Sequence, residues 1–240
     1  MPDTHGAVKT KRSPQLANHA GFPDERTRND AIRFRRGPAR LVGGPGSGKS
    51  TLLRDRTRAI VDSGCPPESI LFITFTRQAV RSLQSDLATL DDPPPVYTLH
   101  AFCLSQLRRA AGDVYVGMEI IDDLALQLLF IPLTCTALGM TPGALSKSLL
   151  AFQNSWHDRD LDIPERRQDF DRFLERLKRA FNVALREELV VRYQTFLEEG
   201  GETPALAHLV VDEYQDLNRA ECDVIDRISA RSESHCRSRR

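Results

Sequence analysis

Hydrophobic positions in the first half of the chain alternate between short continuous runs and runs with helical spacing. The continuous runs, rich in β-branched and aromatic residues, are typical of buried strands and cover residues 39–42, 69–75 and 96–99. The runs with helical spacing, which place apolar side chains on one face of a helix, cover residues 51–61, 77–90 and 101–111. Strands that alternate with helices predict a parallel sheet covered by helices, so we expect an α/β fold.

The pattern changes between residues 122 and 200, where no strand is predicted. Helical spacing covers residues 124–133, 142–152 and 170–197, and the last of these carries a long apolar stripe. A Gly pair at residues 200–201 ends the stripe, and the apolar run at 209–211 predicts a return to the sheet. We therefore expect a helical insert inside one α/β domain, not two domains in tandem.

The two ends of the chain have little to bury. Residues 1–21 combine low apolar content with mixed charge, which predicts a disordered segment. Asn218 and Glu221 have the spacing of a reciprocal helix cap, so we expect a final helix that ends near residue 228. The Ser/Arg-rich residues 229–240 are predicted to be an unfolded tail.

Composition excludes several classes of protein. The chain has 240 residues, with 40% hydrophobic and 28% charged residues and a formal net charge of zero, so bulk charge gives no argument for nucleic acid. It has no apolar run of about 18 residues and no secretory signal at its start. Its five cysteines and six histidines lack metal-ligand spacing. We expect a cytoplasmic protein without a membrane partner, whose only metal accompanies a nucleotide.

A glycine-rich string separates the first predicted strand from the first predicted helix. It matches G-x-x-x-x-G-K-[ST], in which backbone N–H groups surround phosphates, the Lys reaches the outer phosphates and the hydroxyl holds Mg²⁺. A glycine-rich turn without a ligand is the alternative. The residues so assigned to a nucleotide are Gly43, Gly44, Pro45, Gly46, Ser47, Gly48, Lys49 and Ser50.

An acidic string, D-E-Y-Q-D, begins at Asp212 directly after the apolar run 209–211. It should therefore lie at the carboxyl end of a buried strand, where open α/β sheets bind ligands. Alone it is also compatible with a surface cluster of carboxylates. Together with the glycine-rich string, it predicts that the chain binds and hydrolyses a nucleoside triphosphate.

Two further strings follow the second and third predicted strands. They are T-F-T-R-Q-A at residues 74–79 and T-L-H-A-F at residues 98–102. Each brings hydroxyls, an aromatic ring and a basic or imidazole group to the ligand edge of the sheet. These groups suit phosphate contacts and stacking on the bases of a single strand. The alternative is an ordinary strand end, with Phe102 as a core residue.

In this order the four strings resemble the UvrD/Rep family of superfamily 1 DNA helicases, which also have a helical insert before D-E-x-Q-D. The resemblance implies a RecA-like P-loop NTPase parallel sheet interrupted by an all-helical insert. It divides the chain into an ATP-binding domain at 22–103 and 203–228 and an insert at 104–202. It also implies ATP and Mg²⁺ as cofactors, single-stranded DNA as partner, and a role in DNA repair.

The same resemblance assigns roles by position. For the nucleotide, Lys49 would neutralise the outer phosphates, Thr51 would contact the α-phosphate side, and Ser50 and Asp212 would hold Mg²⁺. For hydrolysis, Glu213 would act as general base and Gln215 would sense the γ-phosphate. The residues that would line the DNA path are Phe75, Thr76, His100 and Phe102.

The chain departs from the family pattern in two places. If Ala31 matches the family alanine, Arg28 replaces the Gln that reads adenine, which puts adenine selectivity in doubt. The family's second RecA-like domain does not follow residue 228, so we expect a fragment. Two functions stay open: the ATP-binding part of a helicase that needs a second motor domain, or a truncated, non-catalytic module that binds nucleotide and single-stranded DNA. A P-loop kinase would leave the T-F-T and T-L-H-A-F strings unexplained.

Overall fold

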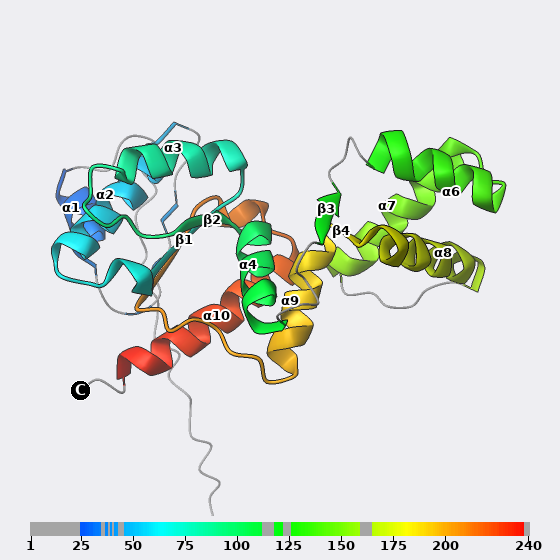
Figure 1. The fold of residues 1–240 in the computed structure, drawn as a ribbon. Coiled ribbons are helices and arrows are strands. Elements are labelled where there is room, and N and C mark those ends of the chain that lie inside the picture. Colours follow the sequence, from blue (N-terminus) through cyan, green and yellow to red (C-terminus); the bar gives the residue numbers. More distant parts are fainter. Residues whose placement is uncertain are drawn as a thin grey trace, which may run out of the picture.

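A parallel sheet lies at the centre of the larger part of the molecule (Figure 1). The computed structural model describes residues 25–34, 37, 39, 41–42, 46–111, 118–121, 126–158 and 165–237. Within them the strand order is β2-β1-β5, with all pairs parallel. The strands are β1 (Ile70–Thr74), β2 (Val96–Thr98) and β5 (His208–Val211). Ile73 pairs with both Tyr97 and Val211, so the three strands end at one edge.

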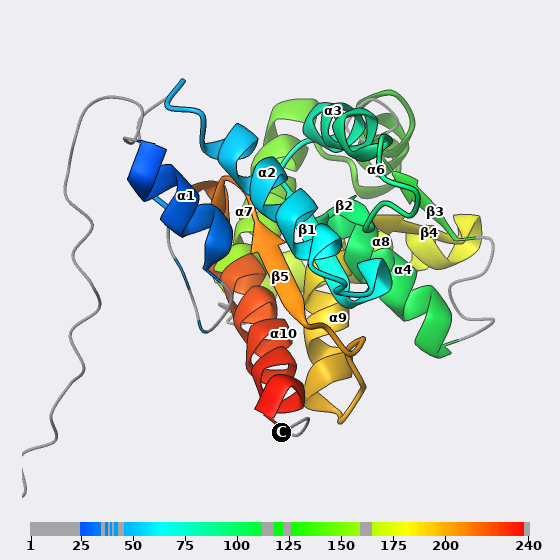
Figure 2. The same cartoon turned by 90° about the vertical axis from the view of Figure 1, so that its left-hand side faces the viewer.

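Helices cover both faces of this sheet, and the alternation of side chains along β1 explains why (Figure 2). Phe72 packs on one face with Leu83 and Leu87. Leu71 and Ile73 belong to the cluster on the other face. The first face is covered by α2 (Lys49–Asp62) and α3 (Arg77–Leu87). The second is covered by α4 (Leu99–Ala111), α9 (Glu188–Glu198) and α10 (Arg219–Arg237). All five strand positions of β1 are buried, as expected of a central strand.

Helix α1 (Glu25–Arg33) lies against α2 without burying any residue. Polar contacts hold it there instead. Arg56 on α2 donates to the carbonyl oxygen of Ala31 at 2.9 Å, and its guanidinium lies 5.7 Å from the centre of the Phe34 ring. Arg28 forms an ion pair with Asp55. The position of α1 therefore depends more on the contacts of Arg28 and Arg56 than on the burial of apolar side chains.

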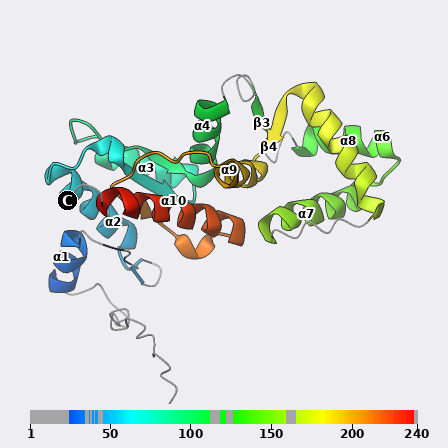
Figure 3. The same ribbon diagram turned by 90° about the horizontal axis from the view of Figure 1, so that it is seen from below.

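The helical insert has a hydrophobic core of its own and lies beside the sheet domain (Figures 1 and 3). Two short parallel strands, β3 (Glu119–Ile121) and β4 (Val183–Leu185), carry the chain into the insert and back. Between them come a π-helical turn (Leu126–Phe130), α6 (Ile131–Leu138), α7 (Pro142–Asp158) and α8 (Glu165–Phe181). The core is formed by Ile121, Leu126, Phe130, Leu145, Leu149, Leu174, Val183 and Leu185. The two short strands thus join two separately packed cores.

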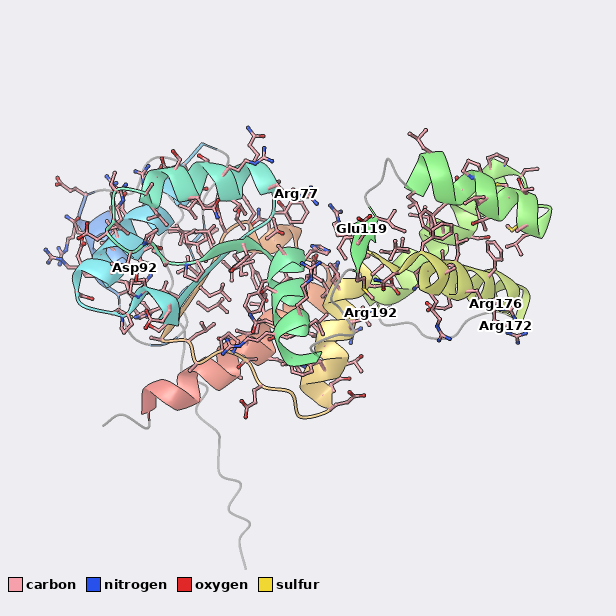
Figure 4. All side chains as sticks on the ribbon, viewed as in Figure 1. Arg77, Asp92, Glu119, Arg172, Arg176 and Arg192 are labelled. Atoms are coloured by element: carbon pink, nitrogen blue, oxygen red, sulfur yellow. The ribbon has the colours of Figure 1, made fainter. Side chains whose placement is uncertain are left out.

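A buried ion pair lies where the insert returns to the sheet domain. Lys178 on α8 pairs with Glu188, the first residue of α9, and their side chains are 2% and 6% exposed. The second carboxylate oxygen of Glu188 accepts a hydrogen bond from the backbone N–H of Leu185 at 2.8 Å. Figure 4 shows Glu119 on β3 and Arg192 on α9 at this joint, and Arg192 lies 3.4 Å from the same carboxylate. The buried carboxylate of Glu188 therefore interacts with groups from α8, α9 and β4, which compensates for its removal from water.

The structure confirms the α/β fold with a parallel sheet, and it confirms strands in the predicted ranges 69–75, 96–99 and 209–211. The predicted strand at 39–42 is wrong for the residues described there, because residues 39, 41 and 42 adopt no regular structure. Val42, which a buried strand would cover, is 66% exposed. In the described part of the chain β5 is therefore the outer strand on that side of the sheet.

The expectation of an all-helical insert is also wrong. The predicted helical stripe 170–197 is interrupted after Phe181, where Asn182 has a φ of 51° and β4 follows. All three residues of β4 are buried, and a short buried apolar run has the same pattern in a strand as in a helix. Periodicity could not separate the two.

The last helix is longer than predicted. α10 begins at Arg219 behind the Asn218–Glu221 cap and continues to Arg237, beyond the predicted end near residue 228. Ala, Arg and Glu in this stretch are good helix formers, which favours continuation of the helix. The predicted disordered segment 1–21 and residues 238–240 lie outside the described residues.

Candidate functional site

All four sequence strings come to the carboxyl edge of the sheet. Phe75 follows β1, Leu99 follows β2 and Asp212 follows β5, and the strands end in register because Thr74 pairs with Thr98 and Ile73 pairs with Val211. The glycine-rich string leads into α2, which packs on β1 and β5 through Leu53. This edge therefore brings the described end of the glycine-rich string close to the acidic string and to the starts of the other two strings.

The described end of the glycine-rich string has a backbone suited to an anion. Gly46 and Gly48 have φ values of 72° and 76°, in the left-handed region that a glycine adopts without steric cost. Backbone N–H groups around such alternating residues form a concavity for phosphate oxygens. Lys49 begins α2 directly behind Gly48, so the first turn of the helix brings further backbone N–H groups to this place. Gly43, Gly44 and Pro45 lie outside the described residues.

Ser47 offers a polar atom without a protein partner. Its Oγ is buried and has no hydrogen-bond partner among the described residues. An unsatisfied buried hydroxyl costs about 1–3 kcal/mol, so folding alone does not explain it. A phosphate oxygen in the glycine-rich loop would accept this hydrogen bond, and the residues present thus fit a nucleotide.

The glycine-rich and acidic strings meet at two side chains. The Ser50 hydroxyl donates to Oδ2 of Asp212 at 2.8 Å. The backbone fixes the carboxylate, because the N–H of Glu213 donates to Oδ1 at 3.0 Å and the N–H of Asp212 donates to the carbonyl oxygen of Ile73 at 2.9 Å. Asp212 is 8% exposed.

This pair of side chains fits Mg²⁺. The ion takes oxygen ligands and usually keeps several waters, so one hydroxyl and one carboxylate suffice beside substrate phosphates. Among the residues that the structure describes, no three His, Cys, Asp or Glu side chains gather as a larger metal cluster. The pair of side chains therefore suits a Mg²⁺ that is bound together with a nucleotide.

Glu213 has an unusual backbone and a side-chain partner. Its φ of 53° lies in the left-handed region, which is strained for a residue with a Cβ. The next three residues form a short 3₁₀ helix, Tyr214–Asp216. Within it the Gln215 side-chain amide donates to Oε2 of Glu213. The two proposed catalytic side chains are therefore in direct contact.

Phe75 and Thr76 both lie at the exposed end of β1. Phe75 is 50% exposed, although all five residues of β1 before it are buried. The Thr76 hydroxyl caps α3 by accepting the N–H of Ala79 at 3.1 Å. Figure 4 shows Arg77 pointing outward from the first turn of the same helix. This corner presents an aromatic ring and a cation together.

The two residues of the T-L-H-A-F string that were predicted to contact DNA differ in exposure. His100 is partly exposed, and its Nε2 lies 3.7 Å from Oε1 of Glu221 on α10. Phe102 is only 2% exposed, and its ring packs edge-on against Tyr193 with 5.8 Å between centroids. The expected DNA contact at Phe102 conflicts with this position, because α4 turns that face onto α9 and no base can reach the ring.

Two contacts of the site were not predicted from the sequence. The spacing of Asn218 and Glu221 revealed the helix cap, but nothing in the sequence connected Glu221 with His100. Likewise Arg28, which replaces the family's adenine-reading Gln if Ala31 matches the family alanine, pairs with Asp55, 27 residues away. Both pairs join elements distant in sequence, so no local pattern could reveal them.

Comparison with known proteins agrees with this geometry. Residues 25–236 match the family model described as the UvrD/REP helicase N-terminal domain. In the part of the chain that the structure describes, every helix is too short or too polar to cross a membrane.

Curated relatives include bacterial helicases. The chain is 27% identical to the ATP-dependent DNA helicase PcrA of Leuconostoc citreum in an alignment over 240 residues, which covers 85% of this chain and 31% of that protein. It is 32% identical over 101 residues to PcrA of Staphylococcus aureus (strain Mu50), covering 39% of this chain and 14% of that protein. The chain thus spans less than a third of the length of these relatives.

Proposed function

The chain belongs to the UvrD/REP helicase family, and on that premise we propose that it is the ATP-binding part of an ATP-dependent DNA helicase. In this proposal ATP hydrolysis at the carboxyl edge of the sheet drives movement along single-stranded DNA. Unwinding would require a second RecA-like domain, supplied in the same chain or in trans.

The contact between Ser50 and Asp212 carries this proposal. It brings the hydroxyl of the phosphate loop to the carboxylate of the acidic string at 2.8 Å. P-loop NTPases hold Mg²⁺ with this pair of groups. A kinase of small molecules would share this contact, but it would have no use for the exposed Phe75 on the neighbouring strand.

The side chains would divide the chemistry of hydrolysis between them. Lys49 would neutralise the outer phosphates, and Thr51 would contact the α-phosphate side. Glu213 would accept the proton of the attacking water, while the Gln215 amide would sense the γ-phosphate. Mg²⁺, when bound, would neutralise charge on the phosphate oxygens. Phosphoryl transfer depends on positioning and charge stabilisation, and these residues supply both.

Single-stranded DNA would lie across the exposed ends of β1 and β2. Phe75 would stack on a base, a contact worth about 1–3 kcal/mol, and its ring is exposed as stacking requires. The Thr76 hydroxyl and the His100 imidazole would contact the backbone. Phe102 has no place in this path because its ring lies in the core.

A second function, binding without turnover, has one observation in its favour. The Gln215 amide donates to Oε2 of Glu213 and so occupies an oxygen that would otherwise face the attacking water. If no second domain draws Gln215 away, the chain would bind ATP and single-stranded DNA without hydrolysis.

ATP hydrolysis by the purified chain, with and without single-stranded DNA, separates these functions. Lys49→Ala and Glu213→Gln serve as controls. Turnover that DNA stimulates and both substitutions abolish would support the motor. Nucleotide binding that depends on Lys49, without turnover, would support the binding module. A folded chain that binds no nucleotide would contradict both.

A further inference from the structure

Two exposed aromatic rings follow neighbouring strands at the carboxyl edge of the sheet. They are Phe75, directly after β1, and Tyr214, three residues after the end of β5, with exposures of 50% and 42%. Among the described residues 46–111 and 188–230, these are the large apolar side chains that are exposed. A single exposed apolar residue is ordinary on a protein surface, but two rings at one edge indicate a ligand with flat, apolar faces.

The strands that carry the two rings pair with each other. Ile73 on β1 pairs with Val211 on β5, and the N–H of Asp212 donates to the carbonyl oxygen of Ile73 at 2.9 Å. Paired strands lie about 4.8 Å apart, so the chain leaves the sheet at two neighbouring points. One leads to Phe75 and the other to Tyr214. A single strand that stacks one base on Phe75 can therefore bring a further base to Tyr214.

Tyr214 belongs to a turn that several hydrogen bonds fix. Glu213 before it has a φ of 53°, and the 3₁₀ helix Tyr214–Asp216 is closed by the N–H of Asp216, which donates to the carbonyl oxygen of Glu213 at 2.9 Å. The N–H of Glu213 donates in turn to Oδ1 of Asp212 at 3.0 Å. Strained residues of this kind cluster at functional sites. Because the backbone is already ordered, a ligand that binds the ring loses little of its affinity to ordering of the turn.

The charges along this edge distinguish the parts of a nucleotide. Three carboxylates lie within two residues of Tyr214 in the chain, namely Asp212, Glu213 and Asp216. On the side of β1, Arg77 begins α3 and points outward (Figure 4). Carboxylates repel the phosphates of a nucleic acid, and a guanidinium attracts them. The Tyr214 ring therefore suits an uncharged base, and the phosphate backbone belongs on the side of Arg77.

We propose that Tyr214 is a second base-stacking residue for single-stranded DNA, so that the strand extends across the ends of β1 and β5 and passes beside the acidic string. This rests on the proposed function, which places single-stranded DNA at the ends of β1 and β2. The same 3₁₀ turn carries Gln215, whose amide donates to Oε2 of Glu213. A base on Tyr214 thus contacts the element that positions the proposed catalytic side chains.

The test separates stacking on Tyr214 from attraction of the phosphate backbone. Fluorescence anisotropy measures the affinity of the purified chain for a labelled oligothymidylate of about 16 nucleotides and for an abasic strand of the same length and charge. Wild type is compared with Tyr214→Ala, Tyr214→Phe and Phe75→Ala. Phe181→Ala is the matched control, because Phe181 is an aromatic residue of the insert that is 57% exposed. Circular dichroism and thermal melting confirm that each variant folds.

In wild type the oligothymidylate should bind more tightly than the abasic strand, because only the strand with bases can stack. Tyr214→Ala should lower the affinity for oligothymidylate about fivefold or more and leave the affinity for the abasic strand unchanged. Tyr214→Phe should bind both strands like wild type, since the ring and not the hydroxyl makes the contact. Phe181→Ala should also bind both strands like wild type.

Three results would contradict the proposal, and they differ from one another. Unchanged affinity for oligothymidylate in a folded Tyr214→Ala overturns the contact, whatever Phe75→Ala shows, and a loss in Phe75→Ala would then leave the proposed DNA path at β1 and β2 intact. Equal weakening of both strands in Tyr214→Ala indicates a disturbed turn in place of a stacking contact. Failure of the wild type to bind either strand overturns the DNA part of the proposed function as well.

Discussion

Ser50 Oγ and Asp212 Oδ2 lie 2.8 Å apart, although 162 positions separate the two residues in the chain. The contact forms only when β5 is paired with β1, because that pairing brings Asp212 to the edge where α2 begins. The helical insert lies between these two residues in sequence but outside the site in space. The nucleotide site is thus a product of the sheet topology.

Asp212→Asn should weaken nucleotide binding only when Mg²⁺ is present. The amide can still accept from Ser50 but lacks the charge that the ion requires. Loss of such a supporting group commonly costs about 10- to 100-fold in metal affinity. Titration with a fluorescent ATP analogue, in Mg²⁺ and in EDTA, measures the difference.

Asp216→Asn is the matched control, because Asp216 is an exposed carboxylate in the same string. It should leave both titrations unchanged. Equal weakening of Asp212→Asn in Mg²⁺ and in EDTA would contradict a role in holding the ion and would point to a disturbed loop.

Glu213→Gly should stabilise the fold and abolish hydrolysis. The φ of 53° at Glu213 costs about 1–2 kcal/mol for a residue with a Cβ, and glycine adopts this φ without that cost. Part of the gain is offset, because glycine loses more backbone entropy on folding. A net gain of about 1 kcal/mol would raise the melting temperature by roughly 2–4 °C. Calorimetry and an ATPase assay measure the two effects.

Asn182→Gly provides the comparison, since Asn182 has a φ of 51° at the entry to β4, outside the site. Asparagine tolerates this backbone region, so the gain should be smaller, and nucleotide binding should not change. A lower melting temperature for Glu213→Gly would show that the Glu213 side chain stabilises the fold instead of straining it.

The sequence predicted the site through topology. The predicted parallel strands at 69–75, 96–99 and 209–211 placed Phe75, His100 and Asp212 near one edge, because the carboxyl ends of parallel strands lie together. The predicted strand at 39–42 was wrong for the residues described there, because residues 39, 41 and 42 adopt no regular structure.

The remaining errors arose where tertiary contacts decide. Phe75 and Phe102 follow strands in similar strings, yet one is exposed and the other packs on Tyr193. Only the position of α9 makes that difference, and α9 is distant in sequence. Similarly, the strand at Val183–Leu185 depends on its pairing with Glu119–Ile121, which local periodicity does not contain.

Phe102→Ala and Phe75→Ala should separate stability from DNA binding. Removing the buried Phe102 ring should cost about 3–5 kcal/mol of unfolding free energy. Removing the exposed Phe75 ring should leave stability nearly unchanged and weaken binding of oligothymidylate by about 1–3 kcal/mol. Urea denaturation and fluorescence anisotropy measure the two quantities. Weaker DNA binding by a fully folded Phe102→Ala would contradict its core role.

Lys178→Met should destabilise the joint between insert and sheet domain. Among the residues that the structure describes, it leaves the buried carboxylate of Glu188 with the Leu185 N–H and the more distant Arg192 as partners. Breaking a buried pair from one side typically costs about 3–5 kcal/mol.

In the double variant with Glu188→Gln the loss should be smaller than for Lys178→Met alone, because no buried charge remains. Urea denaturation followed by circular dichroism measures each free energy, with the exposed neighbour Arg179→Met as control. Equal stability of Lys178→Met and Arg179→Met would show that the ion pair contributes nothing at this joint.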